Sequence, residues 1–394
     1  MNYESLKALA DANFEWPVQL RRTLHRIPES GFQEFMTQKT ICDTLDALGI
    51  PYTTHRTWVV GLIEGAKPGK TIALRADMDG LPVTEPLSCP FRSEHEGWMH
   101  ACGHDGHMAI QLGTARILAS MKDRLCGNVK LLFQPAEETD GGAKPMVEAG
   151  VLENPHVDAC YGLHLMSRLP LGTIETRQGT LNASTDEISI EIIGHSGHAA
   201  YPESGVDAIV CAAQLISALQ TLVSRNVSPI VGAVLTFGKI SGGSARNIIC
   251  DSVKMEGTLR TADPELRHEL QERIREMSAN IAAAFGAEAK VEIIEGYSPL
   301  VNHDREAKLV LNLASELFGE NKVILKDAPS MGGEDFSYFI EDTPGAFYHI
   351  GCTPEEKMPG AALHNPGFSP DEECLRQGLM MQTGIVLREM GIEL

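Results

Sequence analysis

Apolar positions along the chain alternate between helical and strand spacing, and this alternation predicts an α/β protein. The first fifty residues have helical spacing on both sides of Pro28, which predicts two helices around a turn between residues 4 and 49. Short apolar runs typical of buried strands follow at 58–64, 71–77, 128–133 and 159–163. Helical spacing returns at 108–121, between the second and third of these runs.

The pattern changes near residue 184. Residues 187–193 alternate between apolar and polar with period two, as a half-exposed strand does. Helices are expected next at 206–224 and 264–285, and strands at 230–241, 253–261 and 288–297. This β-α-β-β-α-β order is typical of a ferredoxin-like α+β domain.

The last part of the chain returns to the earlier character. A helix is expected at 305–318, a strand at 347–352 and a closing helix at 371–390. We therefore expect one α/β domain in two parts, residues 1–183 and 298–394, interrupted by an inserted domain at 184–297.

Composition narrows the class of protein. A length of 394 residues with 43% hydrophobic content suits two or three globular domains. A formal net charge of −20 argues against nucleic acid and anionic membranes as partners. No window approaches a membrane span, and the first twenty residues lack a signal pattern. Nine cysteines without paired spacing indicate reduced thiols, so we expect a cytoplasmic protein.

The stretch M-H-A-C-G-H-D-G-H, residues 99–107, holds the densest candidate chemistry. Three histidines, one cysteine and one aspartate lie within nine residues. Burying that many unpaired polar groups would cost a few kcal/mol each. Neutral imidazole and thiolate are preferred ligands of zinc-like ions, so the stretch predicts a metal site. The alternative is a reactive or buried cysteine beside incidental histidines.

Polar residues also follow three of the expected strands. Asp77 and Asp79 end the second strand, Glu137 and Glu138 follow the third, and His164 follows the fourth. Open α/β sheets bind ligands at the carboxyl ends of strands. Adjacent side chains point in different directions, so one glutamate can bind metal while its neighbour faces a substrate. An Asx turn at the aspartates and a solvated acidic loop at the glutamates are the alternatives.

Six motifs in order resemble a known family. They are M-H-A-C-G-H-D-G-H, L-L-F-Q-P-A-E-E, G-L-H-L, G-H-S-G-H-A-A-Y-P, M-G-G-E-D-F and L-H-N-P-G-F. The set resembles the hippurate hydrolase and indole-acetyl-amino-acid hydrolase branch of the dinuclear aminoacylase/carboxypeptidase metallohydrolases. The stretch R-R-T-L-H-R-I-P-E, residues 21–29, is similar to that branch as well.

The resemblance implies a mixed-sheet metallohydrolase catalytic domain with an inserted ferredoxin-like lid and dimerisation domain. It also implies two divalent metal ions, zinc or manganese, with cobalt or nickel also compatible. Glu137 is implied as the general base. The implied metal ligands, with the cysteine bridging both ions, are Cys102, His104, Glu138, His164 and His364.

The inserted domain is implied to complete the site. By resemblance, His198 stabilises the oxyanion in the other subunit of a homodimer, and Asn247 and Arg260 hold the substrate carboxylate. The wider clan carries a His-x-Asp motif where this chain has Asp77-Met-Asp79, so we expect these aspartates to orient a ligand histidine. His100, His107 and His195 are expected to be structural or supporting residues.

Together these features predict a metal-dependent amidohydrolase. Its expected substrates are small N-acyl amino acids, with N-acetyl, benzoyl (hippurate) or indole-acyl groups, cleaved to a carboxylic acid and a free amino acid. Two alternatives stay open: a dipeptidase or carboxypeptidase of the same family, and a non-catalytic protein that binds metal or a small molecule.

Overall fold

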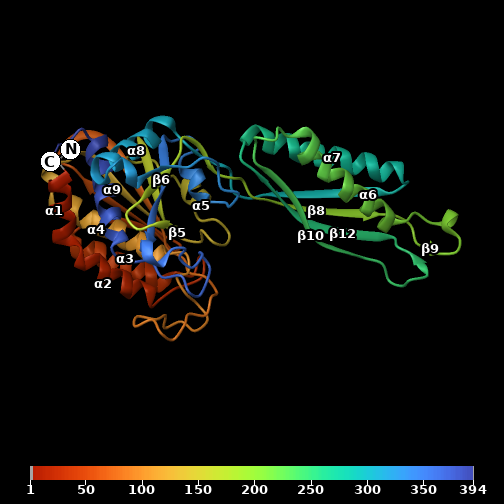
Figure 1. The fold of residues 1–394 in the computed structure, drawn as a ribbon, viewed down its shortest axis with the longest axis horizontal. Coiled ribbons are helices and arrows are strands. Elements are labelled where there is room, and N and C mark those ends of the chain that lie inside the picture. The colour runs from red at the N-terminus through yellow and green to blue at the C-terminus, as the bar shows by residue number, and fades with distance from the viewer. Residues whose placement is uncertain (1–2, 394) are drawn as a thin grey trace. The chain divides into compact units, whose positions relative to one another are not determined.

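The computed structural model describes residues 3–393, which form two compact units (Figure 1). The first contains the chain up to Gly179, Val301–Asp327 and the chain from Asp335 on. The second contains Thr180–Leu300 and Ala328–Glu334. The sequence assigns this short last segment to the final part of the α/β domain instead. The difference arises because Ser330 exchanges backbone hydrogen bonds with Leu181 and Ala183, contacts that composition does not reveal.

The first unit is built on a mixed sheet of eight strands in the order β1-β2-β4-β3-β5-β16-β6-β15. β3 runs parallel to β4 and β5, and β16 runs parallel to β5, whereas β2 and β4 are antiparallel. Its strands are β1 (Tyr52–His55), β2 (Trp58–Glu64), β3 (Lys67–Asp77), β4 (Cys126–Gln134), β5 (Ala159–Pro170), β6 (Ile174–Thr176), β15 (Val323–Leu325) and β16 (Gly345–Thr353).

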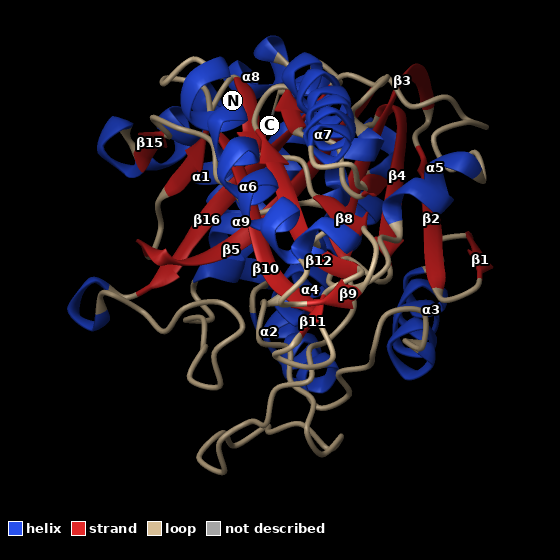
Figure 2. Ribbon diagram, turned by 90° about the vertical axis from the view of Figure 1, so that its right-hand side faces the viewer, coloured by secondary structure: helices blue, strands red, loops and turns tan. Residues whose placement is uncertain are grey.

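Helices pack on this sheet and bury its apolar residues (Figures 1 and 2). The helix after the His/Cys stretch contacts β3 and is packed in turn by the second and last helices of the unit. The helices are α1 (Tyr3–Asn13), α2 (Glu15–His25), α3 (Phe35–Leu48), α4 (His104–Ser120), α5 (Ala143–Glu148), α8 (Asp304–Phe318) and α9 (Cys374–Glu389). The prediction of two helices before residue 49 is wrong, because a one-residue break at Phe14 separates α1 from α2.

A second correction concerns His164, which was expected just after a strand. β5 continues past it to Pro170, so His164 lies inside the strand. It pairs with His349 of β16. The neighbouring strand β3, however, pairs with β5 only as far as Arg75 opposite Gly162 and ends at Asp77. His164 is therefore level with the end of β3, which places it at the polar edge despite its position in β5.

The second unit is an antiparallel sheet of four strands in the order β10-β12-β8-β13, with α6 and α7 packed on one face (Figure 1). Numbered along the chain, this order is 2-3-1-4, the ferredoxin-like arrangement. Its elements are β8 (Asp186–Ile193), α6 (Ala208–Thr221), β10 (Ala233–Gly242), β12 (Ser252–Thr261), α7 (Pro264–Ala284) and β13 (Glu288–Glu295). The predicted α/β fold with an inserted smaller α+β domain is confirmed. Short pairs join β9 (Gly197–His198) to β11 (Ile248–Ile249) and β7 (Gly179–Asn182) to β14 (Leu300–Asn302).

One helical stretch of this unit, Ala208–Asn226, is long and apolar enough to cross a membrane by length and composition. The expectation that no window approaches a membrane span is therefore wrong. In the structure, α6 buries a stripe of small and aliphatic residues at helical spacing, namely Ala208, Cys211, Ala212, Leu215 and Leu219. These residues belong to the apolar core of the second unit. Packing against the sheet thus explains the apolar residues of this stripe.

Candidate metal centre

The five residues expected to be ligands lie together in the first unit, although they are spread over more than 260 positions of the chain. The donor atoms of Cys102, His104 and His164 lie within 4.8 Å of one another. The same limit holds for Cys102, Glu138 and His364. Both groups contain Cys102, so its sulfur lies within reach of the donors of both. We call these five residues the donor cluster.

Each member of the donor cluster is held by a different element. His104 is the first residue of α4, and the turn before it places Cys102, with Gly103 at a φ of 89°. His164 projects from β5, and Glu138 follows the end of β4. His364 lies in a loop, and its own backbone N–H donates to Ala101 C=O at 2.9 Å. This hydrogen bond fixes the loop to the turn that carries Cys102.

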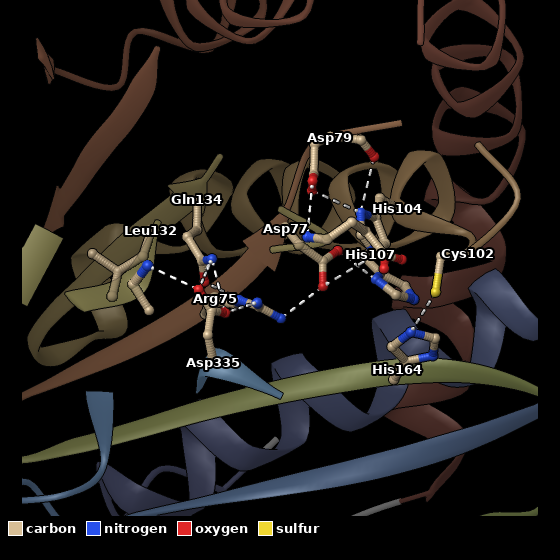
Figure 3. A network of polar contacts seen from close by, with 12 residues as sticks. Arg75, Asp77, Asp79, Cys102, His104, His107, Leu132, Gln134, His164 and Asp335 are labelled. Carbon is tan, nitrogen blue, oxygen red and sulfur yellow. Dashed lines mark hydrogen bonds and ion pairs between the residues drawn. The ribbon is translucent and has the colours of Figure 1, made fainter. Parts of the chain in front are cut away.

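The hydrogen bonds of the two buried histidines direct one ring nitrogen of each into the cluster (Figure 3). His164 Nδ1–H donates to Leu165 C=O at 2.8 Å, and its Nε2 lies 3.3 Å from Cys102 Sγ. His104 Nδ1–H donates to Asp79 C=O at 2.9 Å, and its buried Nε2 has no hydrogen-bond partner among the described residues. An imidazole whose Nδ1–H is fixed by a carbonyl presents an Nε2 lone pair, the form that binds a metal.

The charges around the cluster favour a cation. Burial raises the pKa of the Cys102 thiol well above its usual value, and the carboxylates of Glu138 and Glu137 raise it further. Burial by itself lowers the pKa of His104, but the carboxylates led by Asp77 outweigh it and raise the pKa to about 10. The anionic surroundings therefore call for positive charge, which a metal ion would supply while stabilising the thiolate.

Asp79 and Asp77 support the cluster from behind. Asp79 Oδ1 lies 3.2 Å from His104 Nδ1, and its Oδ2 accepts the backbone N–H of Glu138 at 3.0 Å. Asp77 Oδ1 accepts His107 Nδ1–H at 2.6 Å, and His107 Nε2 accepts the backbone N–H of Leu165 at 2.9 Å. Both ring nitrogens of His107 are thus occupied, so it supports β5 beside His164 and is not a donor to the centre.

Arg75 is a supporting residue that the sequence did not reveal. Its guanidinium is fully buried and donates to Asp77 at 2.6 Å, to Asp335 at 3.0 Å and to Gln134 at 2.7 Å (Figure 3). These partners come from β3, β4 and the M-G-G-E-D-F motif. Burial raises the pKa of Asp335 to about 6 against the opposing effect of Arg75. The available signal was an arginine between the apolar residues of the segment 72–76.

Two non-glycine residues, one in the donor cluster and one next to it, have left-handed backbone conformations. Ala136 has a φ of 57° and His364 a φ of 63°. Such conformations cost of order 1–3 kcal/mol and gather at functional sites. The turn at Ala136 precedes Glu137 and Glu138, whose carboxylates both reach His104, with all three donors within 4.8 Å. Two adjacent acids therefore serve one site.

The other expected site residues lie in the second unit. Ile248 of β11 pairs with His198 of β9, and Asn247 C=O accepts the backbone N–H of Ala199 at 3.1 Å, so His198 and Asn247 are neighbours. His198 is exposed, and its Nδ1 accepts the backbone N–H of Ala200 at 3.1 Å. A neutral His198 ring therefore carries its proton on Nε2. Arg260 lies apart from them on β12, partly exposed.

Comparison with known proteins shows which family and which proteins the chain is similar to. Residues 73–388 match the family described as peptidase family M20/M25/M40. An N-acetyldiaminopimelate deacetylase of Bacillus cytotoxicus is 42% identical over 365 residues, covering 92% of this chain and 95% of the relative.

Two crystal structures share the fold. A protein of methicillin-resistant Staphylococcus aureus, described as an aminohydrolase, superposes with a TM-score of 0.93 at 32% identity, covering 99% of this chain and 100% of the other. A Bacillus subtilis protein, described as a dinuclear metal binding peptidase from the M20 family, has a TM-score of 0.85 at 34% identity, covering 97% and 99%.

Proposed function

The chain belongs to peptidase family M20/M25/M40, and we propose that it hydrolyses the amide bond of N-acyl amino acids with two bound divalent cations. Peptidases cleave amide bonds with water, so the expectation of a hydrolase acting on an amide is confirmed. The observation that carries the proposal is the donor cluster with a second carboxylate, Glu137, in reach of it.

The substrate class follows from two lines of support. The N-acetyldiaminopimelate deacetylase acts on an N-acetylated amino acid, which favours a short acyl group here. The motifs resemble hydrolases of benzoyl and indole-acyl conjugates, which extends the expected acyl groups to hippurate and indole-acyl substrates. All of these substrates share an α-carboxylate beside the amide.

The donors suit the proposed cations. One buried thiol, three imidazoles and one carboxylate favour zinc, and the carboxylate also accommodates manganese; cobalt or nickel are compatible with the same set. The ions would be held by the donor cluster, to which Cys102 would contribute a thiolate. When bound, such a pair activates water and polarises the amide carbonyl.

Glu137 performs the proton transfers. It lies beside Glu138 in the turn after β4, and its carboxylate is half-buried at the edge of the cluster. It accepts a proton from the attacking water and donates it to the nitrogen of the leaving amine. One carboxylate therefore serves first as base and then as acid.

The second unit recognises the substrate. His198 carries a proton on Nε2, and this N–H donates to the oxygen on which negative charge develops. We propose that it reaches the active site of the other subunit in a homodimer. The planar guanidinium of Arg260 suits a carboxylate, and the Asn247 side chain adds a hydrogen bond. We further propose a cytoplasmic location.

Assaying the purified, metal-loaded protein on four substrate classes tests the proposal. We expect turnover of N-acetyl-amino acids, including N-acetyldiaminopimelate, and of hippurate or indole-acyl conjugates, with little turnover of free dipeptides. Exclusive cleavage of dipeptides would favour the dipeptidase or carboxypeptidase alternative. Stoichiometric metal binding without turnover of any class would favour the non-catalytic alternative, which the presence of Glu137 in the cluster argues against.

Mixing two inactive variants tests the role of His198. His198→Ala and Glu137→Gln protomers are each expected to lose activity. If His198 acts across a dimer interface, a mixed dimer contains one site with both residues intact, so up to half of the wild-type activity per mixed dimer should return. The mixture is compared with each variant alone after the mixed species has been purified by two different tags. Silence in purified mixed dimers would place His198 in the same chain as the site that it serves.

A further inference from the structure

Glu34 is a buried carboxylate that the proposed chemistry does not use, yet it contacts the turn that carries the proposed base. Its side chain is fully buried at the start of α3. Glu34 Oε1 accepts the backbone N–H of Ala136 at 2.9 Å. Ala136 directly precedes Glu137 in the chain, 102 residues after Glu34. This hydrogen bond connects the N-cap residue of α3 to the turn that carries Glu137.

The peptide that Glu34 holds has an unusual conformation. Ala136 has a φ of 57°, in the left-handed region that residues with a Cβ rarely adopt. Its C=O accepts the backbone N–H of Gly141 at 3.0 Å, which closes the turn on its other side. Without the bond from Glu34, the Ala136 N–H would be a buried donor with no carboxylate to accept it, and the left-handed turn would lose this restraint.

The loop before Glu34 is packed directly on the same turn. A Cβ on Gly31 would lie 2.8 Å from Ala136 Cβ and 2.2 Å from Thr139 Oγ1, so only glycine fits. The same loop also contacts the loop that carries Asp79, because Glu29 C=O accepts the backbone N–H of Gly80 at 2.7 Å. The segment 28–34 therefore contacts both backbone turns that support the donor cluster.

The second oxygen of the Glu34 carboxylate also has a hydrogen-bond partner. Its Oε2 accepts the hydroxyl of buried Thr57 at 2.6 Å. Glu34 occupies the N-cap position of α3 but makes no side-chain capping bond there. Burial raises its pKa to about 7, against the hydrogen bond from Thr57. A buried carboxylate is costly unless its hydrogen bonds compensate, and these bonds are made to Thr57 and to the catalytic turn.

We propose that Glu34 is a positioning residue for Glu137: it fixes the left-handed Ala136 peptide and so sets the direction of the base relative to the donor cluster. This inference rests on the proposed role of Glu137. Glu34 is proposed to act through Ala136 and not on the substrate or the reacting atoms directly. Its effect is expected on the rate of the chemical step, because a displacement of the base by about 1 Å can cost about 100-fold in rate.

Three variants and one matched control test this role. Glu34→Ala removes the bond to Ala136, and Glu34→Asp shortens the side chain by one methylene so that it no longer reaches. We expect both to lower kcat about 10–100-fold, with KM and metal content within twofold of wild type. Glu34→Gln keeps an oxygen for Ala136 and a donor for Thr57, so its kcat should stay within about threefold. Thr57→Val removes the other bond of the same carboxylate and should leave kcat within about threefold.

The measurements separate positioning from stability. Thermal unfolding is recorded for all four variants. Glu34→Ala removes both buried hydrogen bonds of the carboxylate and Thr57→Val removes one of them, so Glu34→Ala is expected to destabilise the protein more. The inference is overturned if Glu34→Ala and Glu34→Asp both keep wild-type kcat, or if Thr57→Val loses as much kcat as they do. Glu137→Gln is assayed in parallel: full activity there would refute the proposed function itself rather than the role of Glu34.

Discussion

Replacing Glu137 with glutamine should abolish most turnover and leave the metal content unchanged. Glutamine has nearly the same shape but cannot accept a proton from water, so the loss should be about 10²–10⁴-fold in kcat. Because Glu137 lies beside the five donors without being one of the expected ligands, both ions should stay bound. The measurements are kcat on an N-acetyl-amino acid and metal content by elemental analysis of the same sample.

The exposed Asp140 provides the control for that experiment. It lies in the same acidic turn, three residues after Glu137. Asp140→Asn removes one negative charge near the site and should change kcat less than twofold. If Asp140→Asn and Glu137→Gln lowered kcat equally, the loss would come from the changed charge of the turn and not from the loss of a general base. Wild-type kcat in Glu137→Gln would remove Glu137 from the mechanism.

Replacing Cys102 with alanine should have the second large effect, on metal content as well as on activity. Cys102 belongs to both three-donor groups that lie wholly within the donor cluster as described above, so its loss leaves each of these two groups with two donors. We expect fewer than two ions per chain after dialysis and a loss of activity of at least 100-fold, since a site without its ions cannot activate water. Elemental analysis and kcat at several added metal concentrations measure both effects.

A second buried thiol serves as the matched control. Cys160 lies on β5, four residues before His164, and is fully buried outside the donor cluster. Cys160→Ala should lower the free energy of unfolding by a small amount and leave two ions bound. If Cys102→Ala still binds two ions, the bridging thiolate is refuted. If both variants lose metal equally, the effect comes from disturbed packing and not from a lost ligand.

The sequence predicted most elements of the fold because their apolar periodicity is strong. The four strands of the inserted unit and its two long helices appear within a few residues of their expected positions, for example α7 at Pro264–Ala284 against an expected 264–285. The failures have a common origin in long-range contacts. The extension of β5 beyond His164 depends on pairing with β16, almost two hundred residues later. The placement of Ala328–Glu334 depends on hydrogen bonds to Leu181 and Ala183.

The donor cluster could be anticipated because its members carry unusual chemistry in short motifs. His104 and Cys102 attract notice in the sequence by their spacing alone, and the expectation that Asp79 orients a ligand histidine agrees with its contact to His104 Nδ1. Residues that act through the backbone gave no such signal. Glu34 resembles any helix-start glutamate until its bond to Ala136 is seen. The expectation that His107 is a supporting residue agrees with its two occupied ring nitrogens.

The division of the first unit into separate stretches of chain has a consequence for biosynthesis. Four of the five donors precede Thr180, whereas His364 and the strand β16, which lies between β5 and β6, follow the whole insertion. As the chain leaves the ribosome, the early segments cannot complete their sheet until the later ones emerge. During synthesis there is therefore an interval in which Cys102, His104 and His164 have been synthesised but the donor cluster still lacks His364. Loading with metal is thus expected to follow translation.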